Sequence, residues 1–302
     1  MAGDLIYGVP APGLVKVPAG ARQLSPLIPG SMDIAGLAES SADSAFILAP
    51  PGTLERDYVL AQALRVLKPG APITAFAPKD KGGSRLRKCL EGFGCVVTEE
   101  ARKHHRFCTA LRPAAAAGLA GAITAGAPRL VPSLGLWSQP GVFSWDRPDP
   151  GSVRLMEALP DLHGAGADLG CGIGLLARTV LGSPKVKSLI CADIDARAVA
   201  CADHNLTDAR VKVVWADLRR PLEGVGDLDF VVMNPPFHDA GAEDRALGVA
   251  FIEAAARVLG KRGVCWLVAN RHLPYEAALA SVFAGVVLKG EGGGYKIFEA
   301  HK

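Results

Sequence analysis

The feature that most constrains the fold is a regular alternation of short apolar runs with longer helical patterns in the second half of the chain. Apolar runs typical of strands occupy residues 165–170, 188–193, 211–217, 229–234 and 264–270. Helical patterns fill the intervals at 173–182, 196–206 and 245–260. Strands that alternate with helices of about ten or more residues predict βαβ units, and hence a parallel sheet covered on both faces.

The chain also repeats parts of itself, which predicts a second unit of the same kind. Three pairs of segments match in the same order: 44–52 with 229–237, 65–78 with 257–270, and 92–113 with 282–302. Three weak matches in one order favour duplication of an α/β unit over chance. The expected fold class is α/β, with two tandem Rossmann-like domains whose doubly wound sheets are mostly parallel. Each sheet is expected to have an antiparallel strand at its C-terminal end.

The two copies differ where chemistry is expected. Ala49 stands in the first copy where Asn234 stands in the second, and residues 1–43 contain no Gly-rich turn after a strand. Residues 113–135 are rich in Ala, Gly and Pro and are predicted to be a linker or inter-domain connection. We therefore expect a degenerate domain at 1–130, with a structural or RNA-binding role, and a catalytic domain at 131–302.

Composition excludes several classes of protein. The 302 residues are 49% apolar and 21% charged, which is typical of a globular protein with an ample core. No apolar run approaches the ~18–20 residues that span a bilayer, and the first residues do not predict a signal peptide. The seven cysteines are scattered without a C-x-x-C pair. This pattern favours a reducing cytoplasm and argues against a disulfide framework or a structural zinc site.

A glycine-rich turn is predicted between the strand at 165–170 and the following helix. The sequence ADLGCGIG (167–174) follows the pattern D-x-G-x-G-x-G. Glycines permit a tight turn and close approach of a ligand, and the helix that follows presents free N–H groups. The spacing differs from the dinucleotide fingerprint G-x-G-x-x-G, and a turn without a ligand is the simple alternative. The predicted cofactor residues are Asp168, Gly170, Cys171, Gly172 and Gly174.

Polar residues end the next three strands. Asp193 could accept hydrogen bonds from both hydroxyls of a ribose, and Asp217 from an adenine amine. Ligands of doubly wound sheets bind beyond the carboxyl ends of the strands, so both acids should share one rim with Asp168 and Asn234. A single acid at a strand end is often only a turn former or helix cap, and Asp195 is expected to be one. Ile194 and Leu218, which follow the two acids, complete the predicted cofactor site together with Asn234.

These motifs together resemble a class I S-adenosylmethionine (SAM) methyltransferase that methylates amino groups. The segments GVFSWDRPDPGS (141–152), NPPFH (234–238), VANRHLPY (268–275) and GGYKIFEA (293–300) extend the likeness to bacterial ribosomal RNA guanine-N2 methyltransferases, above all the small-subunit type C enzymes. The resemblance implies SAM as cofactor, no metal, and ribosomal RNA or a ribosomal subunit as partner. It also implies a catalytically inactive first copy, and a monomer is favoured.

The sequence Asn-Pro-Pro-Phe at 234–237 suits transfer of a methyl group to an exocyclic amine. The Asn234 amide oxygen and the Pro235 carbonyl could hold the two amine hydrogens, so that the nitrogen lone pair points at the methyl carbon. Pro235 and Pro236 have fixed φ angles and hold those carbonyls still, which is preorganisation for a transition state. The Phe237 ring could stack on the flat target. Phe143 and His238 are further expected substrate contacts, although a solvated loop explains His238 equally well.

Basic residues are concentrated in the first half of the chain. Residues 1–130 contain 15 Lys and Arg against 10 Asp and Glu, whereas residues 131–302 contain 18 against 20. Such asymmetry predicts a polyanionic partner, although a solvated basic face is the simpler alternative. The residues predicted to bind RNA belong to one basic segment: Lys79, Lys81, Arg85, Arg87, Lys88, Arg102, Lys103 and Arg106.

Two other functions are compatible with the same motifs. One is methylation of a protein glutamine amide, as in release-factor methyltransferases. Those enzymes usually carry Tyr where this chain has Phe237, and their other half is a helical bundle, against which the strand patterns of the first half argue. The second alternative is a non-catalytic RNA-binding protein of ribosome assembly. It would require a damaged cofactor site, and the sequence of the second half retains every motif of that site.

Overall fold

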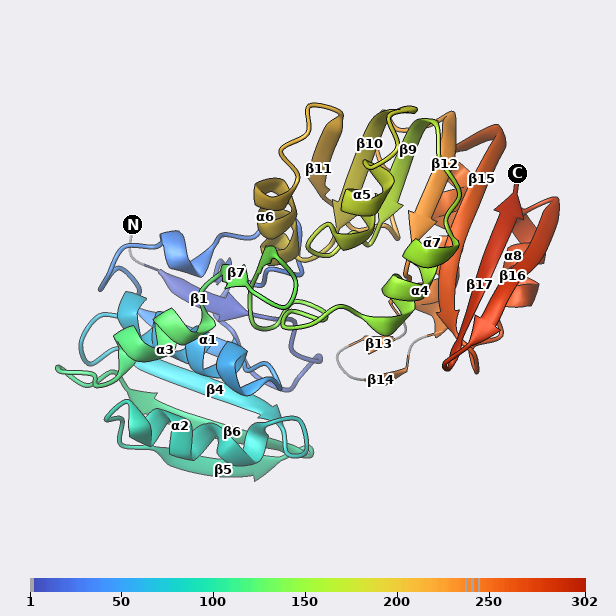
Figure 1. Cartoon of the computed structure of the whole chain (residues 1–302). Helices are drawn as coiled ribbons and strands as arrows, with labels where there is room; N and C mark the ends of the chain where they lie inside the picture. The colour runs from blue at the N-terminus through green and yellow to red at the C-terminus, as the bar shows by residue number, and fades with distance from the viewer. Residues whose placement is uncertain (1–2, 237, 240–241, 244) are drawn as a thin grey trace. The chain divides into compact units, whose positions relative to one another are not determined.

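The computed structural model describes residues 3–236, 238–239, 242–243 and 245–302, and the chain divides into two compact units (Figure 1). Unit 1 comprises Met1–Pro128 with Gln139–Gly141, and unit 2 comprises Arg129–Ser138 with Val142–Lys302. Each unit is built around its own sheet.

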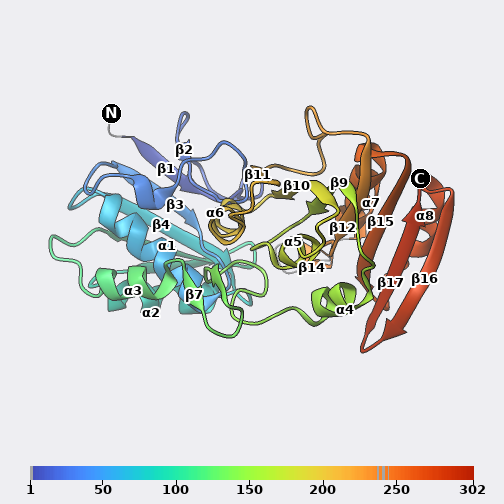
Figure 2. The same cartoon turned by 45° about the horizontal axis from the view of Figure 1, so that its top comes forward.

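Unit 2 contains a seven-stranded sheet in the order β11-β10-β9-β12-β15-β17-β16, which Figure 2 shows side by side. Its strands are β9 (Gly164–Leu169), β10 (Val186–Asp193), β11 (Val211–Trp215), β12 (Leu228–Met233), β15 (Leu259–Asn270), β16 (Gly285–Gly292) and β17 (Tyr295–His301). The first five strands of the order are parallel, and β17 runs antiparallel to both β15 and β16. The expected fold class, including the antiparallel strand at the C-terminal end, is confirmed.

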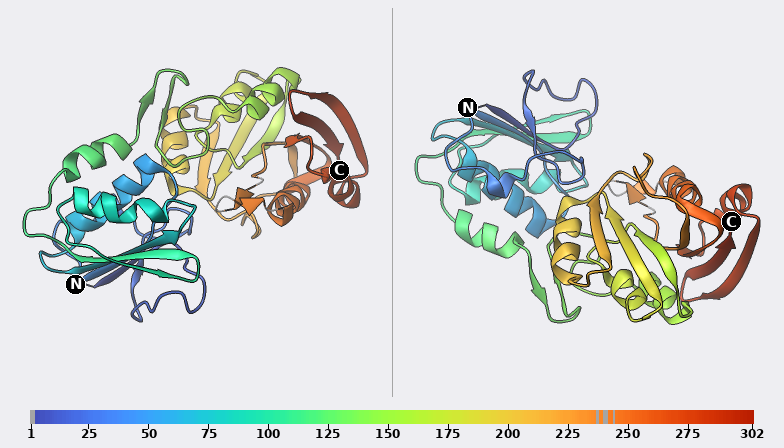
Figure 3. Two further views of the ribbon diagram at one scale, coloured as in Figure 1. Left: turned by 90° about the horizontal axis from the view of Figure 1, so that it is seen from below. Right: turned by 90° about the horizontal axis from the view of Figure 1, so that it is seen from above.

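Helices cover both faces of this sheet (Figure 3). One face packs against α7 (Arg245–Val258) and α8 (Tyr275–Val282). The opposite face packs against α4 (Pro150–Ala158), α5 (Leu175–Val180) and α6 (Ala196–Asn205). Residues 230–233 of the central strand β12 are therefore buried on both sides, which is why this run is continuously apolar instead of alternating.

Unit 1 contains a six-stranded sheet in the order β2-β1-β3-β4-β6-β5. Its strands are β1 (Asp4–Tyr7), β2 (Arg22–Gln23), β3 (Ser44–Leu48), β4 (Pro72–Pro78), β5 (Thr98–Arg102) and β6 (His105–Leu111). If β1 is matched with β9 and β3 with β12, this order is the order of unit 2 without its edge strand β11. The duplication predicted from the sequence is therefore visible in the topology.

The two units differ in the connection between matched strands, which runs from β1 to β3 in unit 1 and from β9 to β12 in unit 2. Within the described part of unit 1, β1 and β3 are joined by the two-residue strand β2 and the 3-10 turn η1 (Ile34–Gly36), where unit 2 has α5, β10, α6 and β11.

The helices of unit 1, α1 (Thr53–Val66), α2 (Leu86–Gly92) and α3 (Leu119–Gly126), contribute to a single core cluster. Leu14, from the loop after β1, joins Phe76 and Phe107 in a small separate cluster.

The segment 113–135, predicted to be a linker or inter-domain connection, contains a boundary between the two units but forms regular structure over much of its length. Residues 119–126 form α3, which packs on α1, and β7 (Arg129–Val131) pairs with β8 (Leu136–Ser138). The small residues serve close packing: a Cβ atom on Gly126 would lie 2.3 Å from the Cβ of Tyr58. Alanine and glycine in this segment therefore mark a tight helix contact, which composition alone does not distinguish from a flexible linker.

The longest helices in the described part of the chain, α1 and α7, have 14 residues each. None of the described helices is both long and apolar enough to cross a bilayer.

Candidate functional site

The predicted glycine turn connects β9 to α5 and is tied to the end of β10. Gly170, Gly172 and Gly174 have φ angles of 77°, 53° and 89°, in the left-handed region that favours glycine. The backbone N–H groups of Gly170 and Cys171 donate to the carbonyl of Ala192 at 2.8 and 3.1 Å. A Cβ atom on Gly172 would meet open space, so the turn presents bare backbone to a ligand at this point.

Asp168 lies beneath the turn and is fully buried, with 0% of its surface exposed. One carboxylate oxygen, Oδ2, accepts a hydrogen bond from the Ala177 N–H at 3.0 Å. The other, Oδ1, is buried and has no hydrogen-bond partner within the described residues. Burial raises the pKa of Asp168 to about 8. A buried acceptor without a partner is costly, and it fits a ligand that brings a donor such as an amine.

Asp193 ends β10 beside the same turn. Its Oδ2 accepts from the Gly172 N–H at 2.8 Å, and its Oδ1 accepts from the Asp195 N–H at 2.9 Å. Burial raises the pKa of Asp193 to about 6, while these backbone donors oppose the shift. Each oxygen keeps lone-pair capacity after its backbone bond, and the carboxylate is held in place. The arrangement fits the two hydroxyls of a ribose, as the sequence predicts.

The structure shows contacts of the remaining strand-end residues that the sequence did not indicate. Asp217 forms a two-point ion pair with Arg219, whose Nε and Nη2 lie 2.8 and 2.9 Å from its two oxygens. This pairing lowers the pKa of Asp217. Ile194 accepts a hydrogen bond from the Trp215 indole at 2.7 Å, and Leu218 is buried. Contact of Asp217 with an adenine therefore stays a prediction, and any such contact would share the carboxylate with Arg219.

Asp195 acts as a helix cap, as expected. Its Oδ1 accepts from the Arg197 N–H at 2.9 Å in the first turn of α6.

Asn234 lies directly after β12 and is held by two residues, Asp149, which is the N-cap of α4, and Ser152, which lies in the first turn of α4. The Asn234 amide nitrogen Nδ2 donates to Asp149 Oδ2 at 2.8 Å and to Ser152 Oγ at 2.9 Å. Asp149 Oδ2 also accepts from the Ser152 N–H at 2.8 Å and so caps α4. Because the amide has two hydrogens and both are used, its oxygen is the group that is left to accept from a substrate.

Asp149 and Ser152 are contacts of Asn234 that the sequence reasoning missed. They belong to the segment 141–152, which supported the family resemblance but received no role of its own. The Asp-Pro pair at 149–150 is a recognisable helix start, with the cap followed by proline. Nothing in a single sequence indicates that this cap meets an amide 85 residues further along the chain.

A small hollow of about 50 Å³ brings several predicted residues together. It is lined by Phe143, Asp149, Ser152, Gly170, Cys171, Gly172 and Asn234, with neighbouring residues of the same loops. Phe143 is 60% exposed there, which leaves an aromatic surface free beside the glycine turn and Asn234. Pro235 is buried and Pro236 half-buried immediately after Asn234.

Two predicted substrate contacts lie at the edge of what the structure describes. Phe237 is outside the described residues. The backbone of His238 belongs to β13 (His238–Asp239), which pairs with β14 (Ala242–Glu243). The stacking role of Phe237 and the substrate role of His238 both stay predictions.

The predicted RNA-binding residues all lie in unit 1. Lys81 and Arg85 are at the 3-10 turn η2 (Gly83–Arg85), and Arg87 and Lys88 lie on α2. Arg102, Lys103 and Arg106 lie at the hairpin of β5 and β6. In the portion of the chain that the structure describes, no group of three or more His, Cys, Asp and Glu side chains is arranged to hold a metal ion.

Comparison with known proteins gives a family match over unit 2. Residues 133–299 match the family described as the methyltransferase small domain, which is more than half of the chain. Ribosomal RNA small subunit methyltransferase C of Shewanella oneidensis is 35% identical over 163 residues, which is 52% of this chain and 46% of that protein. The protein of the same name from Idiomarina loihiensis is 33% identical over 162 residues, covering 53% and 48%. The matched region spans about half the length of these relatives.

A solved structure matches both units. The T. thermophilus 16S rRNA N2 methyltransferase (RsmC), in complex with AdoMet and guanosine, is 26% identical to this chain with a TM-score of 0.74. The match covers 89% of this chain and 75% of that chain.

Proposed function

The chain belongs to the methyltransferase small domain family, and on this premise we propose that it transfers a methyl group from SAM to N2 of a guanine in small-subunit ribosomal RNA. The observation that most supports this proposal is the fixed amide of Asn234, whose oxygen is left to accept beside a bare glycine turn. That pairing of an oriented acceptor with a turn open to a ligand is what amine methylation requires.

The residues around the turn fit SAM. Asp168 Oδ1 would accept from the amino group of its methionine part, and Asp193 from its ribose hydroxyls. The Gly172 backbone leaves room for a ligand to pass close to the chain. When bound, SAM supplies a methyl group on a positively charged sulfur, which is open to in-line attack.

Asn234 and Pro235 would orient the attacking amine. The guanine N2 amine is a weak nucleophile because its lone pair is delocalised into the ring. Its two hydrogens would be held by the Asn234 amide oxygen and the Pro235 carbonyl, which favours a pyramidal nitrogen with its lone pair directed at the methyl carbon. Positive charge that develops on this nitrogen is stabilised by the same two oxygens, which are already in place. The extra proton then leaves to water.

The comparisons support ribosomal RNA over a protein amide as substrate. The relatives that match unit 2 carry the name of a ribosomal RNA methyltransferase, and the solved structure matches 89% of this chain. Unit 1 is a six-stranded sheet in place of the helical bundle expected of a release-factor enzyme. We further propose that unit 1 helps to hold the RNA through its basic segment, while unit 2 contains the SAM site and the chemistry.

The proposal is tested by following labelled methyl groups from SAM. The acceptors are deproteinised small-subunit RNA, large-subunit RNA, intact small subunits and release factors, with the Asn234→Ala variant as control. The expected product is N2-methylguanine in small-subunit RNA, given by the wild-type protein alone. Label in a glutamine of a release factor would replace the proposal with its first alternative. Binding of SAM and RNA without any transfer would instead favour a non-catalytic protein of ribosome assembly.

A further inference from the structure

The hairpin of β5 and β6 in unit 1 has an unfavourable turn. Its two turn residues, Lys103 and His104, have φ angles of 47° and 60°. The matching hairpin of β16 and β17 in unit 2 turns through Gly293 and Gly294, with φ angles of 58° and 87°. Two-residue hairpin turns of this kind need positive φ at both positions and favour Gly or Asn. Unit 1 therefore retains two large side chains at a place where glycine would fit with less strain.

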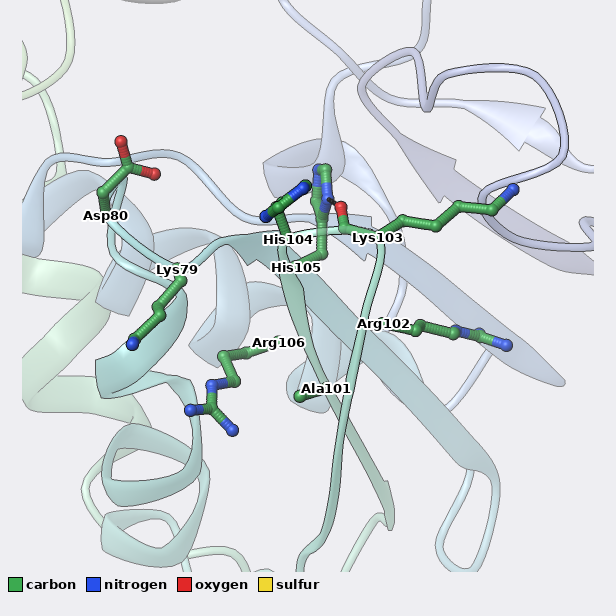
Figure 4. Close-up of a pocket in the computed structure, with 8 residues that line it drawn as sticks. All are labelled: Lys79, Asp80, Ala101, Arg102, Lys103, His104, His105 and Arg106. Atoms are coloured by element: carbon green, nitrogen blue, oxygen red, sulfur yellow. Dashed lines mark hydrogen bonds between the residues drawn. The ribbon is translucent and has the colours of Figure 1, made fainter.

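These side chains form part of a cationic hollow at the hairpin tip (Figure 4). It has a volume of about 660 Å³ and is lined by Lys79, Asp80, Ala101, Arg102, Lys103, His104, His105 and Arg106. Figure 4 shows Arg102 and Lys103 extending to one side of the hairpin, and Lys79 and Arg106 to the other. Positive charge is thus presented on both sides of one turn.

Contacts within unit 1 hold several of these side chains in place. The Arg102 guanidinium lies 4.0 Å from the centre of the Phe107 ring, and Phe107 stacks on Phe76 at 5.3 Å. Lys103 Nζ donates to the Gly13 carbonyl at 2.8 Å. Among the residues that the structure describes, neither Arg102 nor Lys103 forms an ion pair with a carboxylate. A cation fixed in this way loses little conformational entropy when an anion binds to it.

We propose that this hairpin tip is a phosphate-binding site that engages the backbone of the substrate RNA on both sides of the turn. This inference rests on the proposed function, which supplies the RNA. Arginine and lysine bind phosphate oxygens through charge-assisted hydrogen bonds. A nucleic-acid strand offers a regular series of such groups, so that one strand crossing the tip could meet Arg102 and Lys103 first and Lys79 and Arg106 next.

The other cations of the basic segment are engaged differently. Arg87 on α2 forms an ion pair with Glu91 at 2.8 Å, one turn further along the helix. Arg85 Nη1 lies 3.4 Å from the Thr53 hydroxyl. At the tip, Arg106 also pairs with a carboxylate, that of Glu99, at 3.4 Å. The structure therefore assigns the direct phosphate contacts first to Arg102 and Lys103, and the cations of α2 provide a comparison on the same unit.

The experiment compares three double variants of the full chain, each of which removes two positive charges: R102A/K103A, K79A/R106A and R87A/K88A. The affinity for deproteinised small-subunit RNA is measured between 50 and 200 mM salt. Each phosphate contact contributes about −0.7 to −0.9 to the slope of log K against log salt. R102A/K103A should therefore flatten the slope by about 1.4 to 1.8. K79A/R106A should flatten it by less, because Arg106 is paired with Glu99, and R87A/K88A should change it least. The variant R102K/K103R keeps both charges and should keep the slope.

The outcomes distinguish failure of the phosphate site from failure of the proposed methyltransferase function. Wild-type slopes in both tip variants would overturn the phosphate site. Equal flattening in all three double variants would also overturn it, because the binding would then belong to the diffuse charge of unit 1. Methyl transfer is measured on the same samples: if the wild-type protein binds RNA but methylates none, the proposed function fails while the slopes still decide the site. SAM affinity should be the same in every variant.

Discussion

The two units share the outer half of one sheet and differ in the half that would hold a cofactor. The hairpin registers agree closely: β4 and β6 pair Pro72 with Leu111 and Pro78 with His105, as β15 and β17 pair Val264 with His301 and Asn270 with Tyr295. In unit 2 the region between β9 and β12 forms the glycine turn and carries Asp193 and Asp217. The described part of unit 1 has a loop and two short elements there. A sheet of this kind can therefore persist without its cofactor half.

The strand end that carries Asn234 in unit 2 has become structural in unit 1. Sequence alignment of the copies places Ala49 opposite Asn234 and Pro51 opposite Pro236. The Pro51 carbonyl accepts from Arg56 Nη1 at 3.0 Å, and Arg56 is only 2% exposed. A Cβ atom on Gly82 would come within 2.7 Å of that guanidinium nitrogen. A carbonyl in the segment proposed to face a substrate in unit 2 is thus bonded to the protein's own side chain in unit 1.

The largest expected difference between the units comes from Asn234. Asn234→Ala copies Ala49 into unit 2, so the fold should survive while the oriented acceptor is lost. Loss of one preorganised hydrogen-bonding partner typically lowers the rate ~10²–10³-fold, or about 3–4 kcal/mol. Single-turnover methylation at saturating SAM measures the rate, and circular dichroism checks the fold. A rate within a few-fold of wild type would show that Asn234 does not hold the amine.

Asp149 should have a smaller effect, because it acts through Asn234. Asp149→Ala frees one hydrogen of the Asn234 amide and lets it rotate, so the methylation rate should fall about 10- to 100-fold. The variant also loses a helix cap, which costs about 1 kcal/mol of stability.

Asp33→Ala is the matched control for this experiment, since Asp33 caps η1 in unit 1 through the Ala35 N–H. It should lower stability without changing the rate. Equal rates in the two variants would refute the positioning role of Asp149.

We expect SAM to bind only to unit 2, at a site that depends on Asp193. Calorimetry should give one SAM site per chain, and Asp193→Ala should weaken binding by roughly 1–3 kcal/mol, because donors are left unpaired. A stoichiometry near two would show that unit 1 has kept a cofactor site.

The pH dependence of SAM affinity follows from the raised pKa values of the two buried acids. The ribose hydroxyls require ionised Asp193, whose pKa in the free protein is about 6. About one tenth of the Asp193 carboxyl groups are ionised at pH 5, so the protonation of Asp193 alone should weaken SAM binding about tenfold there relative to pH 7. The Asp193→Asn variant should lose this step and keep a second rise toward pH 8, since Asp168 has a pKa of about 8. An unchanged profile in Asp193→Asn would assign the step to another group.

The sequence predicted the elements of unit 2 well because their signals are local. The run at 230–233 is continuously apolar because it is buried on both faces, and Gly170, Gly172 and Gly174 have positive φ angles, which favour glycine. Both signals can be read directly from the sequence of 165–234. The contacts that sequence reasoning missed join distant parts of the chain. The hydrogen bond between Asp149 and Asn234 and the one between Arg56 and Pro51 depend on which loops the sheet brings together. A single aspartate or arginine in the sequence does not indicate which distant residue it will contact.

The smallest expected effect is a change in stability when the residues of the two hairpin turns are exchanged. His104→Gly relieves a positive φ in unit 1, and Gly294→His introduces one in unit 2, where a Cβ atom would meet open space and only backbone strain is added. Each change should shift stability by about 1 kcal/mol, upward for the first and downward for the second. Differential scanning calorimetry should show opposite shifts of about 2–4 °C in the unfolding midpoint. If His104→Gly lowered the midpoint, the turn of unit 1 would not be strained, and its large side chains would need no function to explain their retention.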